Sequence, residues 1–456
     1  MKKVKAICTL TICLCFEVVL CQQSIDSYVV DSSKNVFTLV ASSSNSLSSP
    51  VDLDFYPDQS ARPFQLWILN QGTSSTGGSS VIVSNANKST RTSQYVKDGN
   101  AWHFMAMASA MAFGESNWAT SADILDANRS GGQYTGPTLW PGDLTIYGIL
   151  GNPSSSQVNG SHLSMIHQSP FGKGIAFEKD LVFWVLDGYE GNIKRYDFGQ
   201  PHQPGGANHS AGSVWVYNDF KFTKHATLPS HIVIDANKKY LYGCDPVGKR
   251  IFRIDITTGS DNGSAAKVNN EQLVEYQEYT GLAMKNMVTT NLTSPVGIDI
   301  YGDRLIVTDN ATDEIIIYSI SNNFAEVGRI KLKYASNPDP MGVKVGPDGK
   351  IYFADKYNKR VYMIDNSNAW PLAVNTINET KSEVTVFPNP SNTGSINIAG
   401  FDNLKSYSIY NICGAEIKSN TNTTNNIIST EGLSQGMYIL KLNNSNETKT
   451  IKINIF

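Results

Sequence analysis

The sequence predicts an all-β protein, a six-bladed β-propeller followed by a small C-terminal β-sandwich. Two observations predict the propeller. A unit of short strands and tight turns recurs at spacings of roughly 45 to 65 residues, and an Asp closes the second strand of each clear unit. Such a unit cannot bury its faces alone, so its recurrence implies blades packed in a ring. After Pro371 the chain changes to short alternating strands separated by turn residues, which is typical of a β-sandwich.

The clearest unit runs from Gly174 to Asp197, GIAFEKDLVFWVLDGYEGNIKRYD, and contains three strands and two tight turns. Three later segments repeat this pattern, and they begin at His231, Gly297 and Gly342. Repetition of the closing Asp argues for a structural role, the capping of a turn by side-chain to backbone hydrogen bonds. These aspartates are Asp187, Asp245, Asp309 and Asp355.

The first two blades are inferred from less regular segments. Pro50 to Asn70 supplies two strands of blade one, with Asn70 in the Asp position, and Ala108 to Thr120 supplies two strands of blade two. The long loop that follows carries aromatic residues between Tyr134 and Trp140, which favours an ordered cap over one face.

Two further segments have expected places in the ring. Asn35 to Val40 is strand-like, and we expect it at the outer edge of the last blade, because a free strand edge promotes aggregation. Glu271 to Thr290 is compatible with a short helix or with a strand plus loop. We interpret this segment as a solvated insertion on the rim.

Residues 1–21 are predicted to be a secretory signal peptide, because lysines precede an apolar core that is too short to span a membrane. Lipidation of Cys21 is the disfavoured alternative, since Leu20 is not the small residue that it requires. Removal of the peptide leaves Cys244 and Cys413, too few for a disulfide framework. No later apolar run predicts a transmembrane segment.

We assign residues 22–370 to the propeller, 371–383 to a linker and 384–456 to the sandwich. The formal net charge is −3, and lysine and arginine do not cluster beyond the first few residues. These features exclude nucleic acid and acidic membranes as expected partners.

The units resemble the NHL-type propeller repeat, in which a Pro-x-Gly approach precedes the inner strand and an Asp closes the second. SPVGIDIYGDRLIVTD, which ends at Asp309, and DPMGVKVGPDGKIYFAD, which ends at Asp355, carry this pattern. The resemblance covers Pro50 to Asp365. It implies the fold and not an activity, because propellers carry many unrelated functions.

The C-terminal segment closely resembles the C-terminal sorting domain of the bacterial type IX secretion system. The resemblance is carried by the Phe387-Pro388-Asn389-Pro390 motif, Gly414, the segment from Leu433 to Leu442 and the Lys-rich last strand. It implies an export address that is usually removed at the outer membrane, a Bacteroidetes-like host, and type IX machinery as the partner of residues 384–456. The expected location is secreted or on the outer cell surface.

All seven histidines lie between His103 and His231. Most precede inner strands, whose starts face the mouth of a propeller's central channel. We therefore expect a candidate site for zinc or another divalent metal, because open three-nitrogen sites suit zinc. The candidate ligands are His103, His162, His167 and His231.

Other readings of the histidines stay open. Each can be a hydrogen-bonded structural residue, since no spacing matches a zinc signature. His202 and His209 belong to a separate Gly- and Pro-rich loop, and His225 is expected to be exposed and inert. Calcium is less well supported than zinc, because the Asp-Gly and Asp-Asn loops lack enough convergent carboxylates.

Blade four resembles the lyase domain that completes peptide amidation, a six-bladed propeller. Pro229-Ser230-His231 would place an imidazole at that family's zinc-ligand position. The Tyr and Arg that this family uses have no convincing counterpart, although Tyr189, Arg195 and Arg253 lie within the repeat. The resemblance therefore implies a shared fold and a shared channel metal.

No catalytic motif such as Gly-x-Ser-x-Gly, a Walker loop or a CxxC pair is present. The predicted function is an exported binding or scaffold module for a peptide, protein or carbohydrate. The alternative is a metal-dependent lyase or hydrolase at the channel mouth. A carbohydrate-binding protein would use the loop from Tyr134 to Trp140.

Overall fold

The computed structural model of the chain describes residues 24–128, 134–149, 160–366, 384–411, 415–421, 423, 426–444 and 448–456. The predicted signal peptide, all of the predicted linker, Cys413 and Gly414 lie outside these residues. The chain divides into two compact units, one from Gln23 to Pro371 and one that contains Leu372–Phe456. Each unit is described by itself.

The first unit contains six sheets of four or six strands among its described residues. From the inner strand outward, blade one has β2 (Pro50–Phe55), β3 (Leu66–Thr73), β4 (Gly77–Ser84) and β5 (Thr92–Val96). Blade two has β6 (Ala108–Phe113), β7 (Asn117–Ala122), β8 (Thr138–Pro141) and β9 (Ser164–Met165). Blade three has β10 (Gly172–Lys179), β11 (Val182–Asp187), β12 (Asn192–Asp197), β13 (Ser213–Tyr217), β18 (Glu275–Thr280) and β17 (Ser260–Ser264).

The remaining blades repeat the four-stranded pattern. Blade four has β14 (Ile232–Ile234), β15 (Tyr240–Asp245), β16 (Arg250–Asp255) and β19 (Ala283–Val288). Blade five has β20 (Pro295–Tyr301), β21 (Arg304–Asp309), β22 (Glu314–Ser319) and β23 (Ala325–Lys331). Blade six has β24 (Pro340–Val345), β25 (Ile351–Asp355), β26 (Arg360–Asn366) and β1 (Asn35–Ala41).

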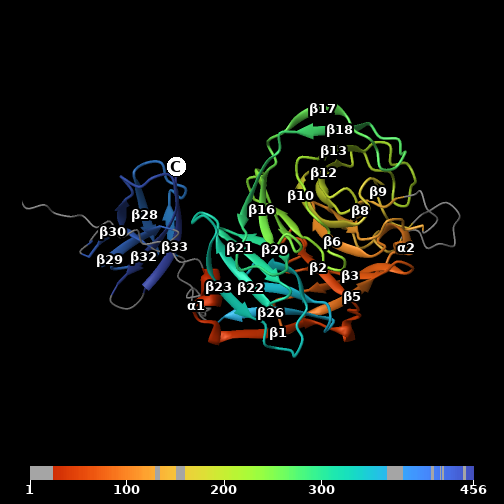
Figure 1. Cartoon of the computed structure of the whole chain (residues 1–456). Coiled ribbons are helices and arrows are strands. Elements are labelled where there is room, and N and C mark those ends of the chain that lie inside the picture. Colours follow the sequence, from red (N-terminus) through yellow and green to blue (C-terminus); the bar gives the residue numbers. More distant parts are fainter. Residues whose placement is uncertain are drawn as a thin grey trace, which may run out of the picture. The chain divides into compact units, whose positions relative to one another are not determined.

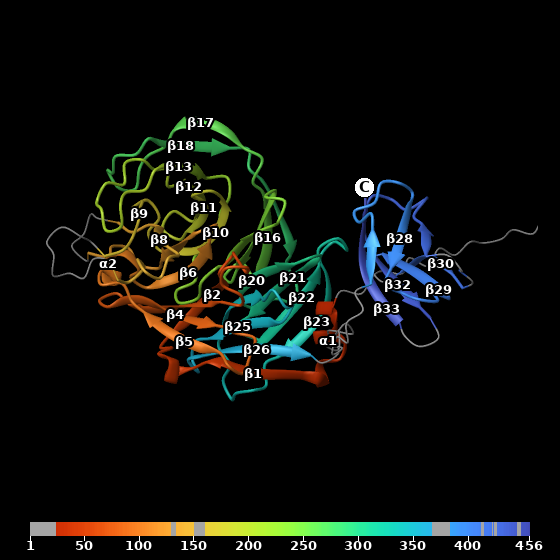
Figure 2. The same cartoon turned by 180° about the vertical axis from the view of Figure 1, so that it is seen from behind.

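The six inner strands form a closed ring. Each contacts the next in the order β2, β6, β10, β14, β20 and β24, and β24 contacts β2 again. In Figures 1 and 2 the inner strands β2, β6, β10 and β20 lie toward the middle of the unit, with β1 and β17 at its edge. The apolar cores lie between neighbouring blades, as where Cys244 and Ile251 of blade four pack with Leu305 and Ile316 of blade five. This geometry confirms the six-bladed propeller.

The N-terminal segment closes the ring as predicted. β1 pairs antiparallel with β26, so the first strand of the described residues is the outer strand of the last blade. Short helices lie beside it and between the first two blades. They are η1 (Ser24–Asp26), α1 (Ser27–Val30), η2 (Ser32–Lys34), η3 (Ser43–Asn45) and α2 (Ala101–Phe104).

The repeated aspartates cap turns, which confirms their predicted structural role. Asp309 accepts hydrogen bonds from the backbone N–H groups of Thr293 and Ser294 at 2.7 and 2.9 Å. Asp245 accepts one from the N–H of Gly248 at 2.7 Å. These bonds satisfy turn donors that strand pairing leaves unpaired.

Two segments differ from the prediction. The expected aromatic cap of blade two contains a strand instead, because β8 lies in it and Trp140 is fully buried against Trp118. Glu271 to Thr290 forms two strands, β18 and β19, so of the predicted alternatives the strand is confirmed, and the segment is not a helix or a loose rim insertion. β19 completes blade four, whereas β18 pairs parallel with β13 of blade three. The insertion therefore joins two blades.

The C-terminal unit is a β-sandwich with alternating buried residues, as predicted. Apolar side chains from both sheets, such as Ile396, Ile409 and Leu440, are fully buried in one core. One sheet has β27 (Thr385–Phe387), β28 (Ser395–Ala399) and β31 (Ile427–Ser429). The other has β30 (Glu416–Asn420), β29 (Ser406–Asn411), β32 (Gly436–Asn443) and β33 (Thr448–Ile455).

Candidate functional site

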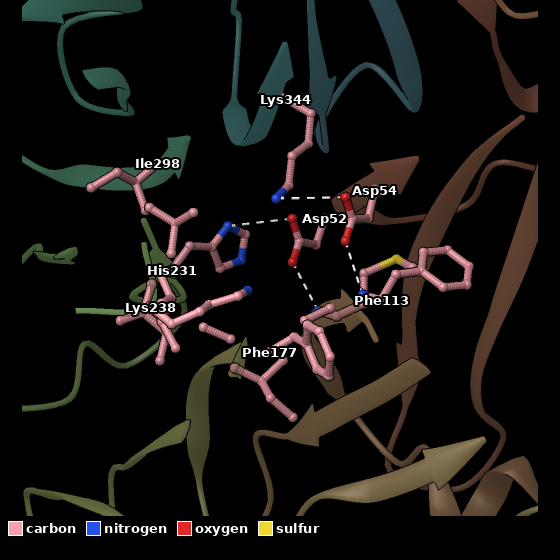
Figure 3. Close-up of a pocket in the computed structure, with 15 residues that line it drawn as sticks. Asp52, Asp54, Phe113, Phe177, His231, Lys238, Ile298 and Lys344 are labelled. Carbon is pink, nitrogen blue, oxygen red and sulfur yellow. Dashed lines mark hydrogen bonds and ion pairs between the residues drawn. The ribbon is translucent and has the colours of Figure 1, made fainter. Parts of the chain in front are cut away.

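A cavity of about 160 Å³ lies in the central channel of the propeller (Figure 3). All six inner strands line it, so the ring itself forms the site. The walls combine aromatic and aliphatic side chains with a few charged groups, which is the usual composition of a small-ligand site. Blades one to six contribute, in order, Asp54, Phe113, Phe177, Ile232, Ile298 and Lys344.

Carboxylates of the channel connect neighbouring inner strands. Asp54 of β2 accepts a hydrogen bond from the backbone N–H of Phe113 in β6 at 2.9 Å. Asp299 of β20 accepts the equivalent bond from Val345 in β24 at 2.8 Å. Asp52 accepts another from β6, so these carboxylates hold the ring together. Each of their oxygens already has at least one protein partner.

Lys344 lies between two of these carboxylates. Its Nζ atom is 3.6 Å from Asp54 and 3.5 Å from Asp299, which belong to the blades on either side. Burial alone would lower the pKa of Lys344, but the surrounding carboxylates outweigh it and raise the pKa above its ordinary value. Lys344 is therefore a fixed cation at neutral pH, suited to binding and not to proton abstraction.

His231 lies in the channel at the entry to β14, and Figure 3 shows its ring directed toward Asp52. Its Nε2 atom is 3.0 Å from the carbonyl oxygen of Ser109, which can only accept, so Nε2 carries the proton. Its Nδ1 atom is 3.5 Å from Asp52. Both ring nitrogens thus have protein partners, and the imidazole connects inner strands of different blades.

Five other histidines form a separate cluster, termed here the histidine cluster: His103, His162, His167, His202 and His209. His202 has its ring centroid 4.9 Å from that of His162 and 5.0 Å from that of His209. His167 is 5.8 Å from His209 and 5.9 Å from His103. Among the described residues, no ring contact joins His231 to this cluster.

The structure therefore corrects the predicted four-histidine arrangement. It brings His103, His162 and His167 together and places His231 elsewhere, in the channel. The physical reason is β9, which the sequence pattern did not reveal. His162 and His167 flank this outer strand of blade two, so they do not face the channel mouth.

Sequence reasoning also missed several residues of both sites. His202 and His209 come from the loop between β12 and β13, which folds back onto β9; Gly205 donates its N–H to the carbonyl oxygen of His162 at 2.9 Å. The charged residues of the channel, in contrast, follow a pattern that is visible in the sequence. Asp54, Asp299 and Lys344 occupy the same position of the repeated inner strand, two residues after the position that holds Gly297 in blade five and Gly342 in blade six.

Two other predictions concern single residues. His225 is half-buried and not exposed as predicted. Its Nδ1 accepts backbone hydrogen bonds from Thr227 and Leu228, at 3.2 and 3.1 Å, so it caps a turn outside the cluster. Cys244 is a free, buried thiol.

None of the helices formed by the described residues has the length and apolar character that a membrane crossing requires.

The fold and the channel define the chain as a six-bladed β-propeller joined to a separate β-sandwich. Residues 385–455 match the family model of the secretion system C-terminal sorting domain. The C-terminal unit is thus a sorting domain of the type IX secretion system, as predicted, and the chain is destined for secretion or the cell surface. Comparison with curated proteins gave no match.

Several solved structures are similar in fold. Auxiliary nutrient binding proteins from Bacteroides ovatus and Bacteroides thetaiotaomicron are 12% and 11% identical, with TM-scores of 0.44 and 0.47; each alignment covers 73% of this chain and 76% of the other. A streptogramin B lyase is 11% identical with a TM-score of 0.41, covering 73% of this chain and 98% of the lyase. These scores are low, so the assignment of the fold rests on the strand order.

Proposed function

We propose that this protein is an exported binding protein, and that its propeller presents a ligand site in the central channel. The sorting domain carries the proposal, because an export address directs the propeller to the cell surface or the medium. A secretory signal peptide at residues 1–21 remains part of the proposal, since type IX substrates must first cross the inner membrane. The machinery that recognises residues 384–456 is its expected first partner.

The channel supports a small, polar ligand that carries an anionic or hydrogen-bond-accepting group. Lys344 is already paired with Asp54 and Asp299, so the cation available to such a ligand is Lys238, which lines the same cavity with its Nζ atom 4.9 Å from the ring of Phe177. Phe113 and Phe177 supply apolar walls. A volume of about 160 Å³ accommodates a compound of few atoms or the end of a larger chain.

A metal-dependent lyase or hydrolase at the channel mouth is less well supported. It would need several imidazoles directed at one axis, and His231 is the one histidine among the described residues that lines this cavity. Its Nε2 proton is held by the carbonyl of Ser109. The arrangement thus favours binding over metal-assisted catalysis in the channel.

Deletion of residues 384–456 is expected to abolish secretion in the native host, because the propeller then lacks its export address. Immunoblots of culture medium, outer membrane and periplasm measure the result. The deleted protein should accumulate in the periplasm, folded, as judged by protease resistance. The control is replacement of residues 384–456 by the sorting domain of another exported protein of the same host, which should restore secretion. Unaltered secretion of the deleted chain would contradict the export role.

Lys238→Ala is expected to weaken ligand binding, whereas Lys239→Ala is not. Both side chains lie in the turn between β14 and β15, but only Lys238 lines the cavity. Thermal unfolding against a panel of small sugar acids, amino acids and dipeptides identifies compounds that stabilise the protein. Loss of a charged contact should weaken these by about 10-fold. Equal responses of both variants would place the ligand outside the channel.

A further inference from the structure

We propose that His162, His202 and His209 form a binding site for a divalent transition metal of the zinc type. This site goes beyond the proposed ligand binding in the channel, because it lies at the outer strand of blade two. One ring nitrogen from each residue lies within 4.8 Å of the others. Small side-chain movements would bring three such atoms to the bond lengths of about 2.0–2.1 Å that zinc requires.

The hydrogen bonds of His202 fix a tautomer that is ready to bind a metal. Its Nδ1 atom is 2.6 Å from the carbonyl oxygen of Gln203, which can only accept, so Nδ1 carries the proton. The Nε2 atom then carries a lone pair. Nε2 is buried and has no hydrogen-bond partner among the described residues. A buried acceptor with no donor is costly, and a metal ion would satisfy it.

His209 is held by the outer strand of blade two. Its Nδ1 atom accepts the backbone N–H of Met165 at 3.1 Å. Metal binding through Nδ1 would replace this hydrogen bond, and binding through Nε2 would move the ring proton to Nδ1. In either case the bond to Met165 changes on loading. This bond therefore reports occupancy of the site.

A carboxylate–histidine pair borders the site. Glu271 accepts hydrogen bonds from the backbone N–H of His167 and from its Nδ1, both at 2.9 Å. Nδ1 of His167 therefore carries the ring proton, and Nε2 carries a lone pair. Many metal sites contain histidines whose second ring nitrogen donates to a carboxylate in this way. Glu271 precedes β18, so the insertion that joins blades three and four also supplies this negative charge.

The chemistry of the donors selects the class of metal. Three neutral imidazoles suit zinc, cobalt, nickel or copper, whereas calcium and magnesium require oxygen ligands. Three protein ligands leave a fourth position for water or a substrate group. The site would also cross-link β9 with the loop between β12 and β13, because His162 belongs to one segment and His202 and His209 to the other.

Titration of the purified protein with cobalt and zinc salts tests the proposal. We expect one equivalent of Co²⁺ to bind with visible ligand-field bands and to be displaced by Zn²⁺. His202→Ala and His209→Ala should each weaken binding by at least about 100-fold, more than loss of an outer-shell partner usually costs. His225→Ala, outside the cluster, is the matched control. His231→Asn separates this site from a channel metal, because it should leave the affinity unchanged.

A measurement on the unmodified protein complements the variants, in case one of them fails to fold. Modification of histidines by diethyl pyrocarbonate, read by mass spectrometry, should be slowed at His202 and His209 by one equivalent of zinc and unchanged at His225. Full stoichiometric binding by His202→Ala and His209→Ala would overturn the proposal. Absence of both binding and protection at micromolar zinc would also overturn it, whereas failure of channel-ligand binding would leave it standing.

Discussion

Lys194→Met is expected to destabilise the propeller by about 3–5 kcal/mol, the usual cost of removing one partner from a buried ion pair. The Lys194 side chain is fully buried in β12. Its Nζ atom is 2.7 Å from Asp187 and 2.6 Å from Glu190, and it donates to the carbonyl oxygen of Gln168 at 2.5 Å. Methionine would fill the space but leave Asp187 as a buried, uncompensated charge.

The repeat shows how unusual this lysine is. In each of the blades three to six, the closing Asp pairs with the first residue of the third strand. Two residues later in that strand, blade three has Lys194, whereas the other three blades have apolar or aromatic residues. These residues are Phe252, Ile316 and Tyr362. Burial alone would lower the pKa of Lys194, but Asp187, Tyr276 and Glu190 outweigh it and raise the pKa. The cation therefore stays charged and depends on its partners.

Chemical unfolding monitored by tryptophan fluorescence measures this effect. Lys179→Met, on an exposed side chain in the same blade, is the control and should change stability little. A double variant, Lys194→Met with Asp187→Asn, should be more stable than Lys194→Met alone, because it also removes the unpaired negative charge. If Lys194→Met is as stable as the unmodified protein, the ion pair contributes nothing to stability, and Lys194 and Asp187 are not a charged pair.

The elements that the sequence predicted well share a local signal. Tight turns, alternating strands and the capping Asp all depend on residues within one blade, so Gly174 to Asp197 reveals its own fold. The sorting domain is recognisable for the same reason, through several motifs in a fixed order. A different argument places Asn35 to Val40: an unpaired strand needs a partner edge, and the outer edge of the last blade supplies it.

The elements that the sequence did not reveal depend on contacts between distant segments. β9 has two residues and β8 lies within a Gly- and Pro-rich stretch, so neither has a readable period. Parallel pairing of β18 with β13 crosses blades and has no local signature. The histidine cluster depends on these elements, so no local pattern shows that the loop of His202 and His209 contacts β9.

The N-terminal segment shows how ring closure should affect stability. α1 contacts β23 and β26, and Tyr28 is fully buried in a core shared by blades five and six. Asp26 forms two hydrogen bonds with Arg304 of blade five, at 2.7 and 2.8 Å. Because β1 then completes blade six, the segment connects the last two blades and closes the ring. Its loss should weaken the whole propeller and not only its edge.

Tyr28→Ala is accordingly expected to lower the free energy of unfolding by about 3–5 kcal/mol, as for other buried aromatic residues. Tyr357→Ala is the matched control, because Tyr357 belongs to blade six and is 67% exposed. Differential scanning calorimetry should show the propeller transition of Tyr28→Ala at a lower temperature and still as one transition, since the closed ring unfolds cooperatively. A new, small transition at low temperature with the main one unchanged would mean that the segment unfolds alone, and that the ring does not depend on it.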